Sequence, residues 1–282
     1  MSITLLRTVA ETQAWTLDLL RQGKTVGLVP TMGFLHEGHL ALMREAKRHA
    51  DVVAVSIFVN PTQFGPSEDF SRYPRDLEGD IVKCQSVGVE VIFAPEPADL
   101  YPEGFLTYVE VAELSRGLCG EKRPGHFRGV ATVVTKLFAL LRPSVAVFGE
   151  KDFQQLQVIK ALARDLNLGV RVVGLPTVRE ADGLALSSRN AYLSTEDRKR
   201  AVAISRGLFA AQKRVQEGGV EVRDLVTTLR QELAQANLRE DYVEVVDAAT
   251  LRSISRVIPE RPARMLVAAF AGATRLIDNI GL

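Results

Sequence analysis

The sequence contains only two cysteines in 282 residues, Cys84 and Cys119. Two isolated cysteines cannot form a disulfide framework, and their spacing matches no metal-binding motif. We therefore expect both thiols to be buried, reduced and chemically inert. Long uninterrupted apolar runs are also missing, so the sequence indicates neither a signal peptide nor a membrane-spanning helix. A cytoplasmic protein is the resulting expectation.

An excess of charge of either sign is likewise absent. Lysine and arginine number 35 and aspartate and glutamate 34, which gives a formal net charge of +1. Such a chain lacks the basic field that would attract nucleic acid or an anionic membrane. We predict neither kind of partner. The length suffices for one large domain or two moderate ones, each with a buried core.

Helical and strand patterns alternate through the first 176 residues. A helix is expected over 9–22, and a second helix over 38–50 lies between two strands, 25–29 and 52–59. The second of these strands is continuously apolar, which is typical of a strand covered on both faces. The alternation then continues with helices over 75–88, 129–143 and 153–167 and strands over 89–95, 144–152 and 170–176. The pattern predicts an α/β fold with a Rossmann-like, doubly wound parallel sheet.

The pattern changes after about residue 176. Two consecutive helices are expected over 195–218 and 222–237, followed by three antiparallel strands over 241–251, 263–272 and 274–282. The sequence therefore predicts a Rossmann-like domain over residues 1–176 and a second, smaller α+β domain over 177–282. The joint falls in a stretch rich in glycine and serine and poor in periodicity.

Two of the chain's four histidines, His36 and His39, lie three residues apart in "VPTMGFLHEGHLALM", between a predicted strand and a predicted helix. Ligands of a doubly wound sheet bind beyond the carboxyl ends of its strands, where helix N-termini favour phosphate. Residues three apart share a helix face, so both imidazoles could donate to one polyphosphate. Gly33 permits an unusual turn, and Gly38 leaves room for a flat ring near the backbone.

Other interpretations of the histidine pair stay open at this point. A helical zinc protease requires two histidines four residues apart with a glutamate between them, and this spacing is one residue too short. A structural metal site requires more ligands, and neither cysteine is near in sequence. The pair could also be ordinary surface or core histidines, because short motifs often match by chance.

Polar residues also gather after two later strands and in the joint between the domains. They are Asn60, Gln63, Lys151, Asp152, Gln155, Ser187, Ser188 and Arg189. Each one alone has an ordinary explanation as a helix cap, a turn former or a solvated charge. Three clusters at the same edge of one sheet together favour a ligand site.

Six motifs in the chain carry a resemblance to a known family: "PTMGFLHEGH", "FVNPTQF", "YPR", "GHFRGV", "FGEKDFQQ" and "LSSRNAYL". In this order, and over nearly the whole chain, they resemble the pantoate–β-alanine ligases. The "HxGH" motif alone would show only kinship with the broader HxGH nucleotidyltransferase superfamily, which includes the class I aminoacyl-tRNA synthetases. The motifs "GEKDFQQ" and "SSRN" favour the narrower family.

The resemblance implies an ATP-dependent ligase that joins pantoate to β-alanine through a pantoyl-adenylate and releases AMP and pyrophosphate, in pantothenate biosynthesis. It implies catalytic roles for His36, His39, Lys151 and Arg189. The implied ATP-binding residues are Met32, His36, His39, Gly149, Lys151, Asp152, Val178, Ser187, Ser188 and Arg189. The implied pantoate-binding residues are Met32, Gln63 and Gln155. The C-terminal domain would act as a lid that excludes water from the reactive intermediate.

The resemblance also implies Mg²⁺ and a homodimer. Asp80 is the candidate metal ligand, although members of this family often carry a second acidic residue where this chain has Gly79. An ordinary solvated helix charge is the alternative for Asp80. The dimer contact is expected around "YVEVAELSRGL", residues 108–118, and the helix after it.

Three rival functions remain open from the sequence. A nucleotidyltransferase acting on a phosphate ester would share "HxGH" but would not use two glutamines placed for a small hydroxy acid. A tRNA-charging enzyme would need a basic stripe and an anticodon-reading domain. A non-catalytic ATP-binding protein would not need lysine, arginine and paired imidazoles together.

Overall fold

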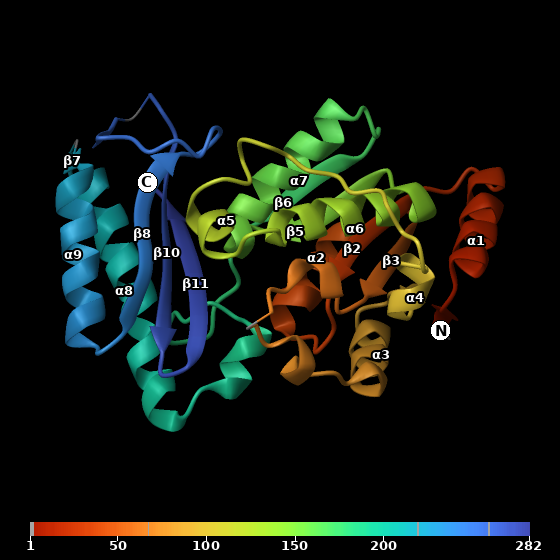
Figure 1. The fold of residues 1–282 in the computed structure, drawn as a ribbon, viewed down its shortest axis with the longest axis horizontal. Helices are drawn as coiled ribbons and strands as arrows, with labels where there is room; N and C mark the ends of the chain where they lie inside the picture. The colour runs from red at the N-terminus through yellow and green to blue at the C-terminus, as the bar shows by residue number, and fades with distance from the viewer. Residues whose placement is uncertain (1–2, 67, 219, 259) are drawn as a thin grey trace. The chain divides into compact units, whose positions relative to one another are not determined.

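The computed structural model describes residues 3–66, 68–218, 220–258 and 260–282 (Figure 1). The chain divides into two compact units. The N-terminal unit comprises residues 1–150 and 155–176, and the C-terminal unit comprises residues 151–154 and 177–282. The short segment 151–154 therefore belongs to the C-terminal unit, although its neighbours on both sides in the chain belong to the other.

The N-terminal unit is built from a parallel sheet and helices. Its elements in chain order are β1 Thr4–Leu6, α1 Val9–Arg21, β2 Val26–Thr31, α2 Glu37–Lys47, β3 Val52–Ile57, η1 Pro61–Gln63, η2 Phe70–Arg72, α3 Leu77–Ser86, β4 Val91–Phe93, α4 Pro97–Leu100, α5 Leu118–Lys122, α6 His126–Leu141, β5 Val145–Gly149, η3 Glu150–Asp152, α7 Phe153–Asp165 and β6 Arg171–Leu175, where η denotes a 3₁₀ helix. The last residues of η3 and the first two of α7 lie in the segment 151–154, which belongs to the C-terminal unit.

The parallel sheet has six strands in the order β1-β4-β3-β2-β5-β6. The chain leaves β2 toward β3 and leaves β5 toward β6, so the direction of winding reverses between β2 and β5. Ligands of such sheets bind beyond the carboxyl ends of the strands at this reversal. The segments that follow β2 and β5 are therefore the first places to look for a site.

Helices cover both faces of the sheet. Val26 and Leu28 of β2 pack in a core with side chains of α1, α6 and α7. Val29 of the same strand packs in a second core with side chains of α2 and α3. Alternate residues of a strand point to opposite faces, so a strand covered on both sides is apolar throughout.

The C-terminal unit combines two long helices with an antiparallel sheet. After the segment 151–154, its elements are η4 Ser188–Tyr192, α8 Thr195–Gln216, β7 Val220–Glu221, α9 Val222–Gln235, β8 Arg239–Asp247, β9 Arg256–Val257, β10 Ala263–Ala271 and β11 Thr274–Gly281. The main sheet has the order β11-β10-β8, and β7 pairs with β9. Leu208 of α8 and Leu229 of α9 share a core with alternate residues of the three long strands.

The structure confirms the predicted fold class: a parallel α/β sheet followed by a smaller antiparallel α+β unit. It adds β1, a short edge strand parallel to β4 that the sequence analysis did not predict. Both cysteines are free and buried, as expected. No helix among the described residues is long and apolar enough to span a membrane.

Candidate active site

A tight turn connects β2 to α2. Gly33 has φ of +81° and Phe34 has φ of +50°, so two successive residues adopt left-handed conformations. A Cβ atom added at Gly33 would lie 3.0 Å from both Asp80 Oδ2 and Ile57 Cγ2. Only glycine combines this conformation with such a close approach without strain. The structure thus confirms the unusual turn expected at Gly33.

Asp80 holds this turn from the neighbouring helix α3. Its Oδ2 accepts a hydrogen bond from Phe34 N and its Oδ1 accepts one from Leu35 N, both at 2.7 Å. The side chain is fully buried, and Lys83 Nζ lies 3.8 Å from Oδ1. Burial raises the pKa of the Asp80 carboxyl above its ordinary value, while the two backbone N–H groups act in the opposite direction. Asp80 is therefore a structural anchor of the turn, and its assignment as a metal ligand stays a prediction.

The two histidines come together at the start of α2. His36 is the N-cap residue, and the ring centroids of His36 and His39 lie 4.1 Å apart with a tilt of 35°. The backbone N–H of His36 donates to His39 Nδ1 at 3.2 Å. An accepting Nδ1 leaves the proton of a neutral His39 on Nε2. His39 can thus donate from Nε2 to a ligand at a helix N-terminus that itself favours an anion.

A buried hydrogen-bond network shapes the segment after β3. Asn60 Nδ2 donates to Gln63 Oε1 and to Gly129 O, both at 3.1 Å. Asn60 Oδ1 accepts from Thr62 N at 3.3 Å. Gly129 O can only accept and Thr62 N can only donate, so the orientation of the Asn60 amide is fixed. A Cβ at Gly129 would lie 2.3 Å from Thr62 O, so only glycine allows α6 this close.

The network leaves Gln63 Nε2 as a donor. This atom lies 3.1 Å from Met32 Sδ, so the structure brings together two of the predicted pantoate-binding residues. The third, Gln155, lies in the first turn of α7, after the neighbouring strand β5. Gly149 ends β5, and a Cβ there would meet no heavy atom within 4 Å. The backbone at Gly149 therefore has open space beside it.

A second hydrogen-bond network binds the main-chain carbonyl of Gln63. No expectation from the sequence included it. His126 Nδ1 lies 2.8 Å from Gln63 O, and Arg123 Nη1 lies 3.0 Å from His126 Nε2. Arg123 also binds Glu68 through two nitrogens, at 2.8 and 2.6 Å. The carbonyl oxygen can only accept, so His126 donates from Nδ1 and accepts at Nε2. The motif "GHFRGV" was the only signal in the sequence, and it gave His126 no role.

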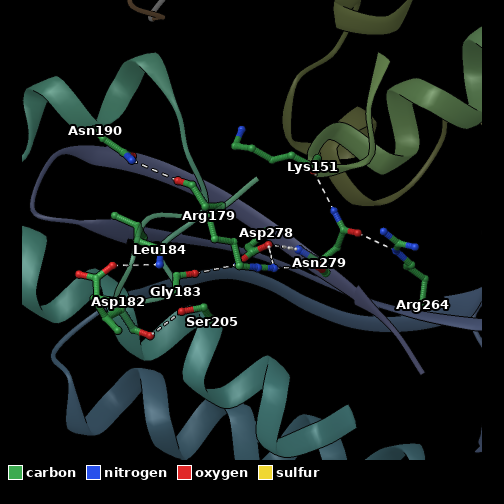
Figure 2. Close-up of polar contacts among 12 residues, drawn as sticks. Lys151, Arg179, Asp182, Gly183, Leu184, Asn190, Ser205, Arg264, Asp278 and Asn279 are labelled. Atoms are coloured by element: carbon green, nitrogen blue, oxygen red, sulfur yellow. Dashed lines mark hydrogen bonds and ion pairs between the residues drawn. The ribbon is translucent and has the colours of Figure 1, made fainter. Parts of the chain in front are cut away.

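In the C-terminal unit, Lys151 and Asp152 lie in η3, which starts at Glu150 just after β5. Lys151 Nζ lies 3.6 Å from Asp152 Oδ2, and the Lys151 side chain is 19% exposed. The carbonyl oxygen of Lys151 accepts a hydrogen bond from Asn279 Nδ2 of β11 at 2.8 Å (Figure 2). The side chain as a whole is partly buried, so a phosphate or carboxylate beside it would be screened less than at the surface.

The remaining predicted ATP-binding residues lie on one loop of the same unit. Val178 O accepts from Leu186 N at 3.0 Å, and this bond helps to fold residues 178–186 into a hairpin-like loop. The loop leads into η4, where Ser187 is the N-cap residue and its Oγ accepts from Arg189 N at 3.3 Å. Ser188 is buried. A small pocket is lined by both Lys151 and Ser187, so these two predicted residues lie close together.

No group of three or more histidine, cysteine, aspartate or glutamate side chains in the described part of the chain could hold a metal ion. Both oxygens of Asp80, the predicted ligand, already accept backbone N–H groups. Magnesium in nucleotide enzymes is commonly held by substrate phosphates with only one or two carboxylates.

Known proteins resemble the chain over its full length. The model of the family described as pantoate-beta-alanine ligase matches residues 4–281. A protein of Myxococcus xanthus (strain DK1622) named pantothenate synthetase is 65% identical over 283 residues, covering 100% of this chain and 97% of the relative. A protein of the same name from Sulfurihydrogenibium sp. (strain YO3AOP1) is 53% identical, covering 95% of this chain and 96% of the relative.

Solved structures agree with these relatives. The crystal structure of pantothenate synthetase from Thermus thermophilus has a TM-score of 0.92 at 47% identity and covers 99% of both chains. The pantoate-beta-alanine ligase of Francisella tularensis was crystallised with beta-gamma ATP and beta-alanine. It has a TM-score of 0.80 at 33% identity and covers 99% of this chain and 97% of that chain.

Proposed function

Because the chain belongs to the pantoate–β-alanine ligase family, we propose that it condenses pantoate with β-alanine through a pantoyl-adenylate, with release of AMP and pyrophosphate. The observation that carries the proposal is the pair of adjacent imidazoles of His36 and His39 at the N-terminus of α2. They lie beyond the carboxyl end of β2, beside the reversal of the sheet, where this class of fold binds nucleotides. The nucleotide bound by the Francisella tularensis relative supports ATP as the substrate.

His36 and His39 would bind the phosphates of ATP. The N–H groups in the first turn of α2 and the positive end of its dipole favour negative charge at the same place. His39 supplies an Nε2–H donor, because its Nδ1 accepts from His36 N. These groups are fixed before the reaction and can stabilise charge that develops on the leaving pyrophosphate.

The first half-reaction needs further positive charge. The carboxylate of pantoate attacks the α-phosphorus of ATP, which is already surrounded by negative oxygens, and pyrophosphate leaves. Catalysis of such a transfer consists mainly of positioning and electrostatic stabilisation. Lys151 and Arg189 would supply this charge, and Ser187 and Ser188 would donate hydrogen bonds to phosphate oxygens. Pantoate itself is the nucleophile, so no protein nucleophile is required.

Pantoate would bind through Gln63, Gln155 and Met32. Gln63 offers its Nε2 donor beside Met32 Sδ, which gives a polar contact for an oxygen of the acid and an apolar wall next to it. The ribose of ATP would bind to Asp152, and Val178 and the open backbone at Gly149 would contact the nucleotide. In the second half-reaction the amine of β-alanine attacks the acyl carbon of the adenylate and AMP leaves.

Mg²⁺ enters the proposal as part of the substrate, bound to the phosphates of ATP. It would neutralise charge on the phosphate oxygens, and the residues described above would bind and orient the complex. The role of the C-terminal unit as a lid and the cytoplasmic location stay predictions.

Homodimerisation around residues 108–118 and through the helix after them is also proposed. Two large apolar side chains support it: Tyr108 is 44% exposed, and Leu106, just before the segment, is 89% exposed. A monomer mass in analytical ultracentrifugation at micromolar concentration would reject this part of the proposal.

Product analysis tests the overall reaction. The purified protein is incubated with pantoate, β-alanine, ATP and Mg²⁺, and nucleotides and acids are separated by chromatography. We expect AMP and pantothenate in equal amounts and no ADP. Formation of ADP, or consumption of ATP without pantothenate, would reject the adenylate route.

A further inference from the structure

Asn279 of β11 holds the backbone of Lys151 in a fixed orientation. Its Nδ2 donates to Lys151 O at 2.8 Å, and its Oδ1 accepts from Arg264 Nε at 2.6 Å (Figure 2). A carbonyl oxygen can only accept and a guanidinium can only donate, so the two partners fix the orientation of the amide. Asn279 is 3% exposed. Water therefore has little access to replace the amide.

The same sheet holds the segment 151–154 at a second point. The guanidinium carbon of Arg264 lies 4.2 Å from the centroid of the Phe153 ring, a stacking distance for arginine on an aromatic face. Arg264 is in β10, which pairs with β11. Two neighbouring strands thus contact the segment, β11 at Lys151 O and β10 at the Phe153 ring. All of these residues belong to the C-terminal unit.

The adjacent residue of β11 holds the loop that leads to Ser187. Asp278 binds Arg179 through both oxygens, at 2.6 and 2.9 Å, and Arg179 Nη1 also donates to Gly183 O at 3.0 Å. Successive residues of a strand point to opposite faces of the sheet. Asp278 and Asn279 therefore anchor two different segments, and these segments bring Lys151 and Ser187 to the same pocket.

We propose that Asn279 is a positioning residue for Lys151: it fixes the main chain from which the ammonium group reaches the phosphates. The inference rests on the proposed function, in which Lys151 stabilises charge in the adenylation step. A fixed main chain removes the need to order the lysine during the reaction. Asn279 itself need not touch any substrate, and its effect is transmitted through the Lys151 carbonyl.

The substitution Asn279→Asp isolates this contact. A carboxylate keeps the size of the side chain and still accepts from Arg264, but it cannot donate to Lys151 O and repels it. We expect kcat for pantoate-dependent exchange of pyrophosphate into ATP to fall by about tenfold to a hundredfold, as for a small misplacement of a reacting group. The KM for pantoate should stay within about twofold, because pantoate contacts other residues.

Two further variants test whether the loss of rate comes from any Asn→Asp change or from the added negative charge. Asn237→Asp makes the same change at an exposed position in the turn after α9 and should leave the rate unchanged. Asn279→Ala removes the donor to Lys151 O, together with the acceptor for Arg264, and adds no charge. It takes the place of Asn279→Asp if thermal unfolding shows that the aspartate variant does not fold as stably as the wild type. An alanine variant that folds and keeps the wild-type rate would overturn the proposal.

A double-mutant cycle separates positioning from a general loss of structure. If Asn279 acts through Lys151, Asn279→Asp should have little further effect in a Lys151→Ala background. Independent, multiplicative losses would overturn the proposal, as would a single variant within about twofold of the wild type. A wild-type protein without exchange activity would instead reject the proposed function. The two failures are therefore distinguishable.

Discussion

Asn60 and Gln63 lie side by side after β3, and Asn60 determines which end of the Gln63 amide faces Met32. Asn60 Nδ2 donates to Gln63 Oε1 at 3.1 Å, which occupies the oxygen and leaves Gln63 Nε2 as the donor. Gly129 O and Thr62 N fix the Asn60 amide in turn. A donor at this place suits an oxygen of an acid substrate, because carboxylate and hydroxyl oxygens accept hydrogen bonds.

The substitution Asn60→Asp should weaken the binding of pantoate. An aspartate cannot donate to Gln63 Oε1 or to Gly129 O, so Gln63 should turn its oxygen toward the substrate. Leaving a buried polar group without its partner costs about 1–3 kcal/mol, so we expect KM for pantoate to rise by about tenfold or more. The KM for ATP should change little. Steady-state kinetics with each substrate varied in turn measures both values.

The control for Asn60→Asp is Asn167→Asp, the same change at an exposed position after α7. It should leave both KM values unaltered. An Asn60→Asp variant with wild-type KM for pantoate would show that the orientation of the Gln63 amide does not govern binding.

The substitution Asp80→Asn distinguishes a structural anchor from a metal ligand. An asparagine can accept from only one of Phe34 N and Leu35 N and points an NH₂ group at the other. We expect the free energy of unfolding to fall by about 1–3 kcal/mol, and the Mg²⁺ concentration for half-maximal activity to stay unchanged. Urea unfolding and a magnesium titration provide the two measurements.

Asp76→Asn is the matched control for Asp80→Asn. Asp76 caps the same helix, accepting from Gly79 N, and asparagine caps helices equally well. Its stability should be close to that of the wild type. If Asp80→Asn instead keeps full stability and requires far more Mg²⁺, Asp80 is a metal ligand rather than an anchor of the turn.

The substitution His39→Ala should lower the rate of adenylation by a factor on the order of a hundred, because it removes a donor fixed toward developing charge. His49→Ala is the control, since His49 follows α2 at its other end and contacts Glu45 at 2.9 Å. That variant should keep nearly the full rate. Rapid-quench measurement of pyrophosphate release gives the rate directly. Similar rates in the two variants would remove His39 from the catalytic machinery.

Asp247 should make the C-terminal unit sensitive to acid. The hydrogen bond from Arg261 Nε, at 2.7 Å, and those from Thr250 hold the pKa of the Asp247 carboxyl well below its usual range. A lowered pKa in the folded state stabilises the fold above the ordinary value of about 4, and this stability is lost as the pH falls through the folded-state pKa.

The acid effect is measured by comparing wild type with Asp247→Asn in thermal unfolding from pH 7 to pH 2. The wild type should be more stable at neutral pH, and the difference in Tm should shrink below about pH 4. A difference that is constant over the whole range would mean that the charge of Asp247 contributes nothing.

The core of the fold could be predicted because its signals are local. The continuously apolar run that forms β3 Val52–Ile57 and the helical stripe of α2 Glu37–Lys47 indicate their structures within a few residues. The strand β1 Thr4–Leu6 was missed because three residues carry almost no periodic pattern. Its state depends on pairing with β4, which lies far along the chain.

The candidate site also has a part that the sequence could predict and a part that it could not. The position of His36 and His39 follows from a general rule about strand ends and helix N-termini, so the sequence located it. The contacts of Asn279 with Lys151 and of His126 with Gln63 join residues from distant segments. Only the tertiary fold brings these partners together, and no spacing in the sequence reports it.

The most direct test of the account is the exchange of labelled pyrophosphate into ATP, measured with Mg²⁺ and without β-alanine. Exchange that depends on pantoate is predicted. Pantoate and ATP form pantoyl-adenylate and pyrophosphate reversibly without β-alanine, so labelled pyrophosphate can return to ATP. ATP binding with no exchange, or exchange that needs no pantoate, would contradict an adenylate formed on pantoate.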